Sequence, residues 1–220
     1  MWLITSAGVA NASSYDLTVS PVHETCVEGS ASPSWAESVL AAEGLRPAQV
    51  DDRAQVKLCG TTARFGHRTF SEGTLSVVVD DGSAFLVGAL QTIGMYAWVE
   101  RTRNKSPYVH GDVDEAHDAT GVHLVWRVHG NEVLSATGAP VDGPTVDEVF
   151  EGPIHQPGGT CFDARLAAAR QRRAFDAATD VVVFGEGPLA DVLRSADFTP
   201  TGWVVAADGV HAKNKTRSCP

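Results

Sequence analysis

Alternating polar and apolar residues predict strands along most of the chain. Residues 15–23 (YDLTVSPVH) alternate in this way, and residues 73–79 (GTLSVVV) are rich in β-branched residues and precede an Asp-Asp-Gly turn. Residues 122–129 and 132–137 form a further pair, and the His-Gly-Asn sequence at their junction predicts a tight hairpin. The same reasoning predicts strands at residues 55–63, 109–113, 148–150, 161–170, 181–184 and 203–206.

Helical periodicity is confined to short stretches. Residues 34–45 (SWAESVLAAEGL) are amphipathic, with Ser34 as N-cap and Glu37 as its capping-box partner. Residues 189–196 predict a second short helix. For residues 85–103 we expect a strand followed by a short helix. One long central helix in this region would instead indicate a hot-dog thioester enzyme.

Many short strands separated by turn signals predict an α+β, β-rich fold with a mostly antiparallel sheet and short peripheral helices. We expect the 220 residues to form a single domain, with an N-terminal arm at 1–14, a β-rich core at 15–206 and a polar tail at 207–220. Residues 139–146 and 151–159 are rich in Pro and Gly and predict structural connections.

The charge balance excludes several classes of function. The chain has 17 basic and 27 acidic residues, a net charge of −10, and no basic stripe, so we expect no nucleic-acid partner. The acidic balance also disfavours binding to anionic membranes. No uncharged apolar stretch is long enough to span a membrane, and the first residues lack a basic n-region, so we expect a cytoplasmic protein.

The cysteines and histidines do not predict a metal site or a redox centre. The four cysteines include no CxxC pair, and we expect reduced, mostly buried thiols. The histidines complete no HExxH or facial-triad spacing, so no metal is expected. No strand leads into a Gly-rich loop, so we expect no nucleotide and no cofactor.

Lysine is scarce in this chain, and it is the residue type that we consider for covalent chemistry. Lys57 alternates with apolar neighbours in a predicted strand, so we expect it to point to solvent. Lys105 lies close to Arg101 and Arg103, and nearby cations with partial desolvation would lower the pKa of its amine and allow Schiff-base formation. The spacing alone also fits a solvated basic turn. The aromatic and polar residues around this stretch, which could line a pocket or fill a core, are Tyr96, Trp98, Tyr108, His110, Met95 and Trp126.

The order of these features resembles the acetoacetate decarboxylase superfamily over roughly residues 15–185. The strand YDLTVSPVH, the helix SWAESVLAAEGLRP and the strand AQVKLCG come in the family's order, followed by Phe70-Ser71-Glu72-Gly73. An apolar stretch then leads to Glu100 and Lys105, and GVHLVWRVHGNEVLSATG resembles the hairpin that follows the family's lysine. The resemblance implies a cone or barrel around a central pocket, with Lys105 as the Schiff-base nucleophile and Glu72 and Glu100 as carboxylates that move protons.

The chain also departs from the family's pattern. Lys105 lies between Asn104 and Ser106 instead of next to a second lysine or after a proline, the substrate-orienting arginine near the first strand has no counterpart, and another pocket carboxylate would fall near Cys59. These departures argue against decarboxylation of a small β-keto acid.

The function implied by the resemblance is therefore a lyase that uses a lysine Schiff base on a keto or polyketide-like small molecule. Decarboxylation, aldol-type condensation and dehydration share this intermediate, so the reaction stays open. The alternatives are a non-covalent cyclase or isomerase of a natural-product pathway and a non-catalytic ligand-binding barrel; each is compatible with a homo-oligomer. The expected substrate-binding residues are Arg101, Arg103, Tyr96, Trp98, Tyr108 and His110.

Overall fold

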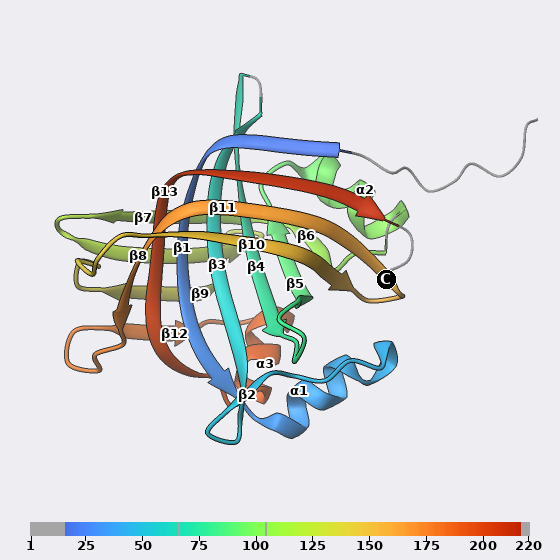
Figure 1. The fold of residues 1–220 in the computed structure, drawn as a ribbon, viewed down its shortest axis with the longest axis horizontal. Coiled ribbons are helices and arrows are strands. Elements are labelled where there is room, and N and C mark those ends of the chain that lie inside the picture. Colours follow the sequence, from blue (N-terminus) through green and yellow to red (C-terminus); the bar gives the residue numbers. More distant parts are fainter. Residues whose placement is uncertain (1–15, 66, 104, 217–220) are drawn as a thin grey trace, which may run out of the picture.

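The computed structural model describes residues 16–65, 67–103 and 105–216, and most of them lie in strands (Figure 1). The strands are β1 (Asp16–Ala31), β2 (Gln49–Val50), β3 (Arg53–Phe65), β4 (Arg68–Val78), β5 (Ala84–Gln91), β6 (Tyr108–His110), β7 (Asp112–Asp118), β8 (Gly121–Val128), β9 (Asn131–Gly138), β10 (Val146–Gln156), β11 (Thr160–Ala174), β12 (Val181–Phe184) and β13 (Thr199–Thr216). The helices are α1 (Pro33–Leu40), α2 (Gly94–Arg103) and α3 (Pro188–Ser195), and a 3-10 helix, η1 (Ala41–Glu43), follows α1.

The larger sheet closes on itself. Strands β1, β13, β11, β10, β5, β4 and β3 pair in that order, and the pairing of β1 with β3 completes the ring. Figure 1 shows these strands curving around a common axis. The pairings of the two sheets are antiparallel except for β10–β5 and β5–β6. The expected β-rich α+β fold, a mostly antiparallel cone, is confirmed.

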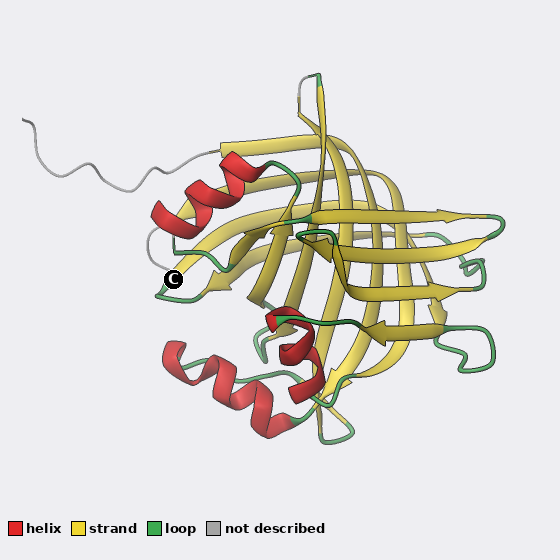
Figure 2. Cartoon of the chain, turned by 180° about the vertical axis from the view of Figure 1, so that it is seen from behind, coloured by secondary structure: helices red, strands yellow, loops and turns green. Residues whose placement is uncertain are grey.

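A second, four-stranded sheet of order β12-β9-β8-β7 packs against the outside of the ring (Figure 2). Its hairpin between β8 and β9 is the predicted one. The apolar core lies between the two sheets and includes Leu58, Leu75 and the fully buried Trp126, for which a core position was the preferred interpretation. Gly73 on β4 allows this close approach, because a Cβ there would lie 3.0 Å from the indole ring of Trp126.

The helices lie at the periphery, and the long-helix alternative is wrong. Residues 85–103 fall into β5 and α2, as expected, and this region therefore forms no long central helix of the kind that a hot-dog enzyme would have. The N-cap of helix α1 is Ser32, two residues before the predicted Ser34; Pro33 lies in the first turn, and no side chain makes a capping hydrogen bond. The backbone amide of Ser32 donates to the carbonyl of Ala196 after α3, at 2.8 Å, which joins the two helices at one end of the ring.

Two segments that were predicted as irregular are strands. Residues 151–155 belong to β10 and pair with β11, despite their Gly and Pro. The predicted tail beyond residue 206 continues β13 up to Thr216, where pairing with both β1 and β11 satisfies its backbone groups. Although this segment was predicted as a polar tail, His211 within it is buried. The predicted N-terminal arm lies outside the described residues.

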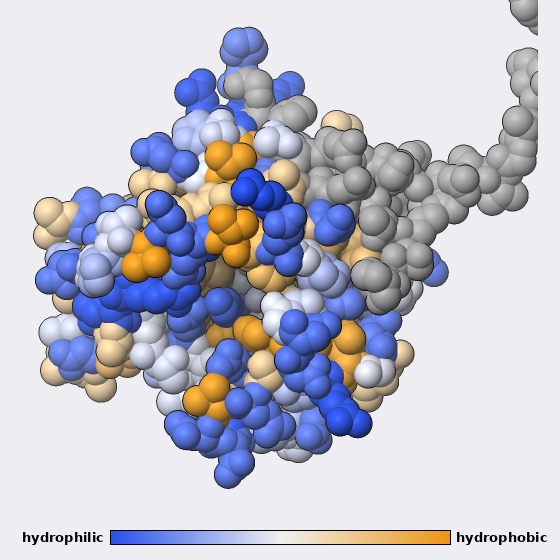
Figure 3. Space-filling model, in the orientation of Figure 1, coloured by the Kyte–Doolittle hydropathy of each residue, from blue (hydrophilic) through white to orange (hydrophobic). Residues whose placement is uncertain are grey.

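The distribution of hydrophobic side chains on the surface is consistent with an apolar core that lies between the two sheets. The face shown in Figure 3 is mostly hydrophilic, with hydrophobic side chains in small separate groups. No described helix has the length and apolar character that crossing a membrane requires.

A buried ion pair outside the ring gives a pH-dependent contribution to stability. The Asp180 side chain is fully buried, and Arg173 Nη2 and Nη1 donate to it at 2.7 and 3.0 Å. Burial alone would raise the pKa of Asp180, but the hydrogen bonds from Arg173 and from backbone amides outweigh it, so this pKa lies below its usual range.

Replacing Asp180 by asparagine should therefore lower the free energy of unfolding at pH 7 by about 1.5–3 kcal/mol. A depressed carboxyl pKa stabilises the fold above the unfolded pKa of about 3.9, so the deficit should shrink as the pH falls below about 4. Urea unfolding of the wild type and the variant, at pH 7 and at a pH below about 4, measures this deficit in the free energy of unfolding. Asp197→Asn is the control, because Asp197 is paired but exposed, and its loss should matter little. A deficit that is the same at both pH values would contradict the prediction.

Candidate active site

A cavity of about 330 Å³ lies inside the ring and receives side chains from each of its strands. The period of two along a strand explains its composition. On β1, Glu24, Cys26 and Glu28 line the cavity, whereas Thr25 and Val27 between them point to the second sheet. On β1, β3 and β4, the polar face therefore lines the cavity, and the apolar face builds the core.

Register aligns the cavity side chains of β1, β3 and β4 into rows, because directly paired residues project from the same face of a sheet. The middle row joins Cys26, Cys59 and Thr74. The rows on either side of it are Glu24–Thr61–Glu72 and Glu28–Lys57–Ser76.

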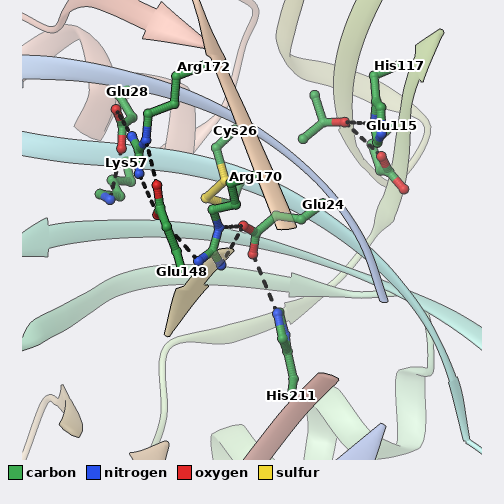
Figure 4. Close-up of a disulfide and its surroundings, with 12 residues drawn as sticks. Glu24, Cys26, Glu28, Lys57, Glu115, His117, Glu148, Arg170, Arg172 and His211 are labelled. Atoms are coloured by element: carbon green, nitrogen blue, oxygen red, sulfur yellow. Dashed lines mark hydrogen bonds and ion pairs between the residues drawn. A yellow bond between two sulfur atoms is a disulfide. The ribbon is translucent and has the colours of Figure 1, made fainter. Parts of the chain in front are cut away.

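The middle row contains a disulfide between Cys26 and Cys59 (Figure 4). The expectation of reduced thiols is wrong for this pair. The cysteines are 33 residues apart in sequence, and only the β1–β3 register places them opposite each other. Cys161 is a buried thiol, as expected.

Arg170 and Glu24 form a buried ion pair at the cavity wall. Arg170 Nε and Nη2 donate to Glu24 Oε1 at 3.2 and 3.1 Å, and both side chains are about nine-tenths buried. Figure 4 shows His211 on the other side of Glu24, where its Nε2 lies 3.7 Å from Glu24 Oε2.

A second group of charges continues this network along the wall. Arg172 donates to both carboxylate oxygens of Glu148, at 3.0 and 2.8 Å, and to Glu28 at 2.8 Å. Lys57 Nζ contacts Glu28 at 2.9 Å. Hydrogen bonds from Arg172 lower the pKa of Glu148. Burial would raise the pKa of Glu28, but Lys57 and Arg172 together lower it, so both carboxylates are ionised at neutral pH.

Glu72 and Tyr108 form the third polar feature of the cavity. The Tyr108 hydroxyl donates to Glu72 Oε1, and both side chains are buried and line the cavity. The Tyr96 ring packs edge-on against Tyr108, with ring centroids 5.8 Å apart. A buried carboxylate held by a phenol at the wall of a cavity is suited to exchange protons with a bound molecule.

Comparison with known proteins supports the fold but not a sequence family. No protein-family model matches the chain, and no curated protein sequence matches it. A solved acetoacetate decarboxylase-like enzyme from Sphingomonas wittichii RW1 superposes with a TM-score of 0.57 at 14% identity, covering 98% of this chain and 97% of that one.

Two further solved structures give the same picture. An acetoacetate decarboxylase superposes with a TM-score of 0.61 at 10% identity, covering 90% of this chain and 87% of that one. Acetoacetate decarboxylase from Legionella pneumophila subsp. pneumophila str. Philadelphia 1 gives 0.58 at 10% identity, with 96% and 90% covered.

The chain has the acetoacetate decarboxylase-like fold. At these identities the likeness establishes the architecture alone, so the role of each residue depends on its place in the cavity.

Within this acetoacetate decarboxylase-like fold, the expected environment of Lys105 is wrong. Lys105 is exposed, has a φ of 53°, and is not among the residues that line the cavity. Its neighbour Ser106 is buried instead, with Oγ 3.0 Å from Glu100 Oε2 and 2.7 Å from Gln156 Oε1. The turn after α2 thus directs Ser106 inward and Lys105 outward, and Lys105 lacks the desolvation that the Schiff-base hypothesis requires.

The other predicted site residues separate into two groups. Glu72 and Tyr108 line the cavity, Glu100 is buried without being part of the lining, and Tyr96 packs against Tyr108. The remaining predicted residues do not line the cavity: Arg101, Trp98 and His110 are exposed, as is Met95, and the side chain of Arg103 lies outside the described part of the chain. Trp98 and Met95 lie on the outward face of α2, which explains their exposure.

Sequence reasoning missed most of the charged wall. Lys57 was expected to point to solvent. It alternates with apolar neighbours as predicted, but the face of β3 that carries it lines the cavity. Part of the signal was present, because the even spacing of Glu24 and Glu28 on β1, and of Arg170 and Arg172 on β11, places each pair on one face of its strand. The alternation did not show that these faces of β1, β3 and β11 surround one cavity.

A smaller polar cluster lies on the opposite face of β1. Thr25 Oγ1 donates to Glu115 Oε2 at 2.8 Å and lies 3.3 Å from His117 Nδ1. Burial lowers the pKa of His117. Among the described residues, no group of three His, Cys, Asp or Glu side chains gathers closely enough to hold a metal ion.

Proposed function

We propose that this protein binds a small carbonyl compound in the cavity and catalyses proton transfer on it without a covalent intermediate. Glu72 is the general base, and Tyr108 positions it. The observation that carries the proposal is the hydrogen bond from Tyr108 to Glu72 inside the cavity. This is the non-covalent isomerase or cyclase alternative to lysine chemistry.

The proposed step is removal of a proton from the carbon next to a carbonyl group. A carboxylate accepts several hydrogen bonds, so the bond from Tyr108 leaves capacity for a substrate proton. Thr61, the cross-strand partner of Glu72, brings a hydroxyl to the same wall, where it could donate to the developing enolate oxygen. Return of the proton to another carbon isomerises the substrate, and attack by the enolate on a second carbonyl closes a ring.

The positions of the lysines argue against Schiff-base chemistry. An amine nucleophile must be uncharged and must reach the substrate. Lys105 is exposed and outside the cavity lining, and Lys57, which does line the cavity, is held as an ion pair with Glu28. Decarboxylation through Lys105, as the resemblance implied, would require this lysine to enter the cavity.

Borohydride trapping tests whether the mechanism is covalent. Wild-type protein is incubated with acetoacetate, pyruvate and 4-phenylbutan-2-one, reduced, and examined by intact mass; no adduct is expected. Replacing Lys105 by alanine should leave the exchange of the α-protons of 4-phenylbutan-2-one for deuterium unchanged. A reduced adduct that maps to Lys105 would overturn the proposal, and binding without exchange would favour a non-catalytic ligand-binding protein.

A further inference from the structure

The cations that line the cavity are already paired with carboxylates of its wall. Among the residues that the structure describes, three permanent cations line it, Lys57, Arg170 and Arg172, together with four carboxylates, those of Glu24, Glu28, Glu72 and Glu148.

Each of these cations is engaged by a carboxylate of the wall. Arg170 makes two bonds to Glu24, and Arg172 makes two to Glu148 and one to Glu28. Lys57 is also paired with Glu28. A carboxylate ligand would therefore have to compete with a glutamate of the wall for its cation, and the cost is largest at the buried pair of Arg170 and Glu24.

The facing wall of the cavity is apolar. It is formed by side chains of β5, β10 and β11, namely Leu86, Phe150, Ile154, Phe162 and Leu166. A ligand that fills the cavity must therefore bury an apolar body against this wall, with its polar atoms toward the hydroxyls and Glu72 on β3 and β4.

We propose that the cavity binds an uncharged carbonyl compound with an apolar body and discriminates against carboxylates. This inference rests on the proposed function, because it names the substrate class of the same cavity. The cost that opposes an anion is the competition with a wall glutamate that is already paired with the cation. The substrate class differs from the β-keto acids that the fold resemblance suggests.

A matched pair of ligands tests the inference. Methyl 4-oxo-4-phenylbutanoate and the 4-oxo-4-phenylbutanoate anion share an aryl ketone and differ in charge. Isothermal titration calorimetry at pH 7 is expected to show the ester binding about tenfold or more tightly than the acid. Equal or tighter binding of the acid would overturn the proposal, and so would an ester that does not bind.

Charge-removing variants test the cause of the preference. Glu24→Gln removes the closer of the two carboxylates that pair with Arg170, the other being Glu148 at 3.7 Å, and should raise the affinity for the acid relative to that for the ester about tenfold. Glu148→Gln should act similarly through Arg172, and because the Glu148 side chain is 29% exposed against 10% for Glu24, it serves if Glu24→Gln does not fold. If the acid gains affinity in neither folded variant, the proposal fails.

Glu115→Gln is the matched control. It also removes one negative charge, but Glu115 lies on β7, outside the cavity lining, and contacts the face of β1 that points away from the cavity. Both affinities should therefore stay at their wild-type values. An equal gain in acid binding in this variant would mean that overall charge sets the preference, which would overturn the proposal.

Deuterium exchange at the ketone α-carbon separates this inference from the proposed function. An ester that binds preferentially but does not exchange supports the substrate class and contradicts proton transfer. An acid that binds preferentially and does exchange overturns the substrate class while proton transfer stands.

Discussion

Replacing Glu72 by glutamine is expected to lower the rate of α-proton exchange on a bound ketone by about 10²–10⁴-fold. Glutamine has nearly the same shape and can still accept a hydrogen bond from Tyr108, but its amide is not a base. The variant should therefore bind 4-phenylbutan-2-one with unchanged affinity and lose the proton transfer. Proton NMR in deuterated buffer measures the exchange, and calorimetry measures the binding.

The effect on the rate should follow the position of Glu72 in the cavity. Tyr108→Phe removes the hydroxyl that holds Glu72 but keeps the buried ring, so a smaller loss is expected. Glu115→Gln, outside the cavity lining, is the control and should exchange as the wild type does. A Glu72→Gln variant that binds the ketone and retains the wild-type rate would rule out Glu72 as the base.

Loss of the Cys26–Cys59 disulfide should lower the free energy of unfolding by about 3–4 kcal/mol. The bond joins residues 33 positions apart, and the chain-entropy model assigns a stabilisation of this size to a loop of that length, because the cross-link restricts the unfolded chain. Urea unfolding of the wild type with and without a reductant measures the difference.

The double variant Cys26→Ser/Cys59→Ser provides the control for this measurement. It should unfold like the reduced wild type, and the reductant should not affect it further. If the reductant destabilises the double variant as much as it does the wild type, the effect does not come from this bond. If reduction leaves wild-type stability unchanged, the cross-link does not contribute to it in solution.

The sequence alone determined where most elements lie and what kind they are. Alternation along a strand depends only on the local period of two, so β3, β4, β8 and β9 were predicted close to their observed positions. The turn between β8 and β9 was also predictable, since Gly130 takes a φ of 80° that glycine adopts readily. Glu72 was identified through the family resemblance, and a core position for Trp126 was preferred because of its apolar neighbours.

Only the tertiary structure decided what each face of a strand meets. Alternation separates a polar face of a strand from an apolar one, but the polar face can meet either solvent or a cavity. Because pairing of β1 with β3 closes the ring, the face of β3 that carries Lys57 lines the cavity. The disulfide depends on the same long-range register. Lys105 is the opposite case, a residue expected in the pocket that is exposed, because the turn after α2 buries Ser106 and leaves the lysine in solvent. Pairing between strands far apart in the chain sets these outcomes, and no local pattern encodes it.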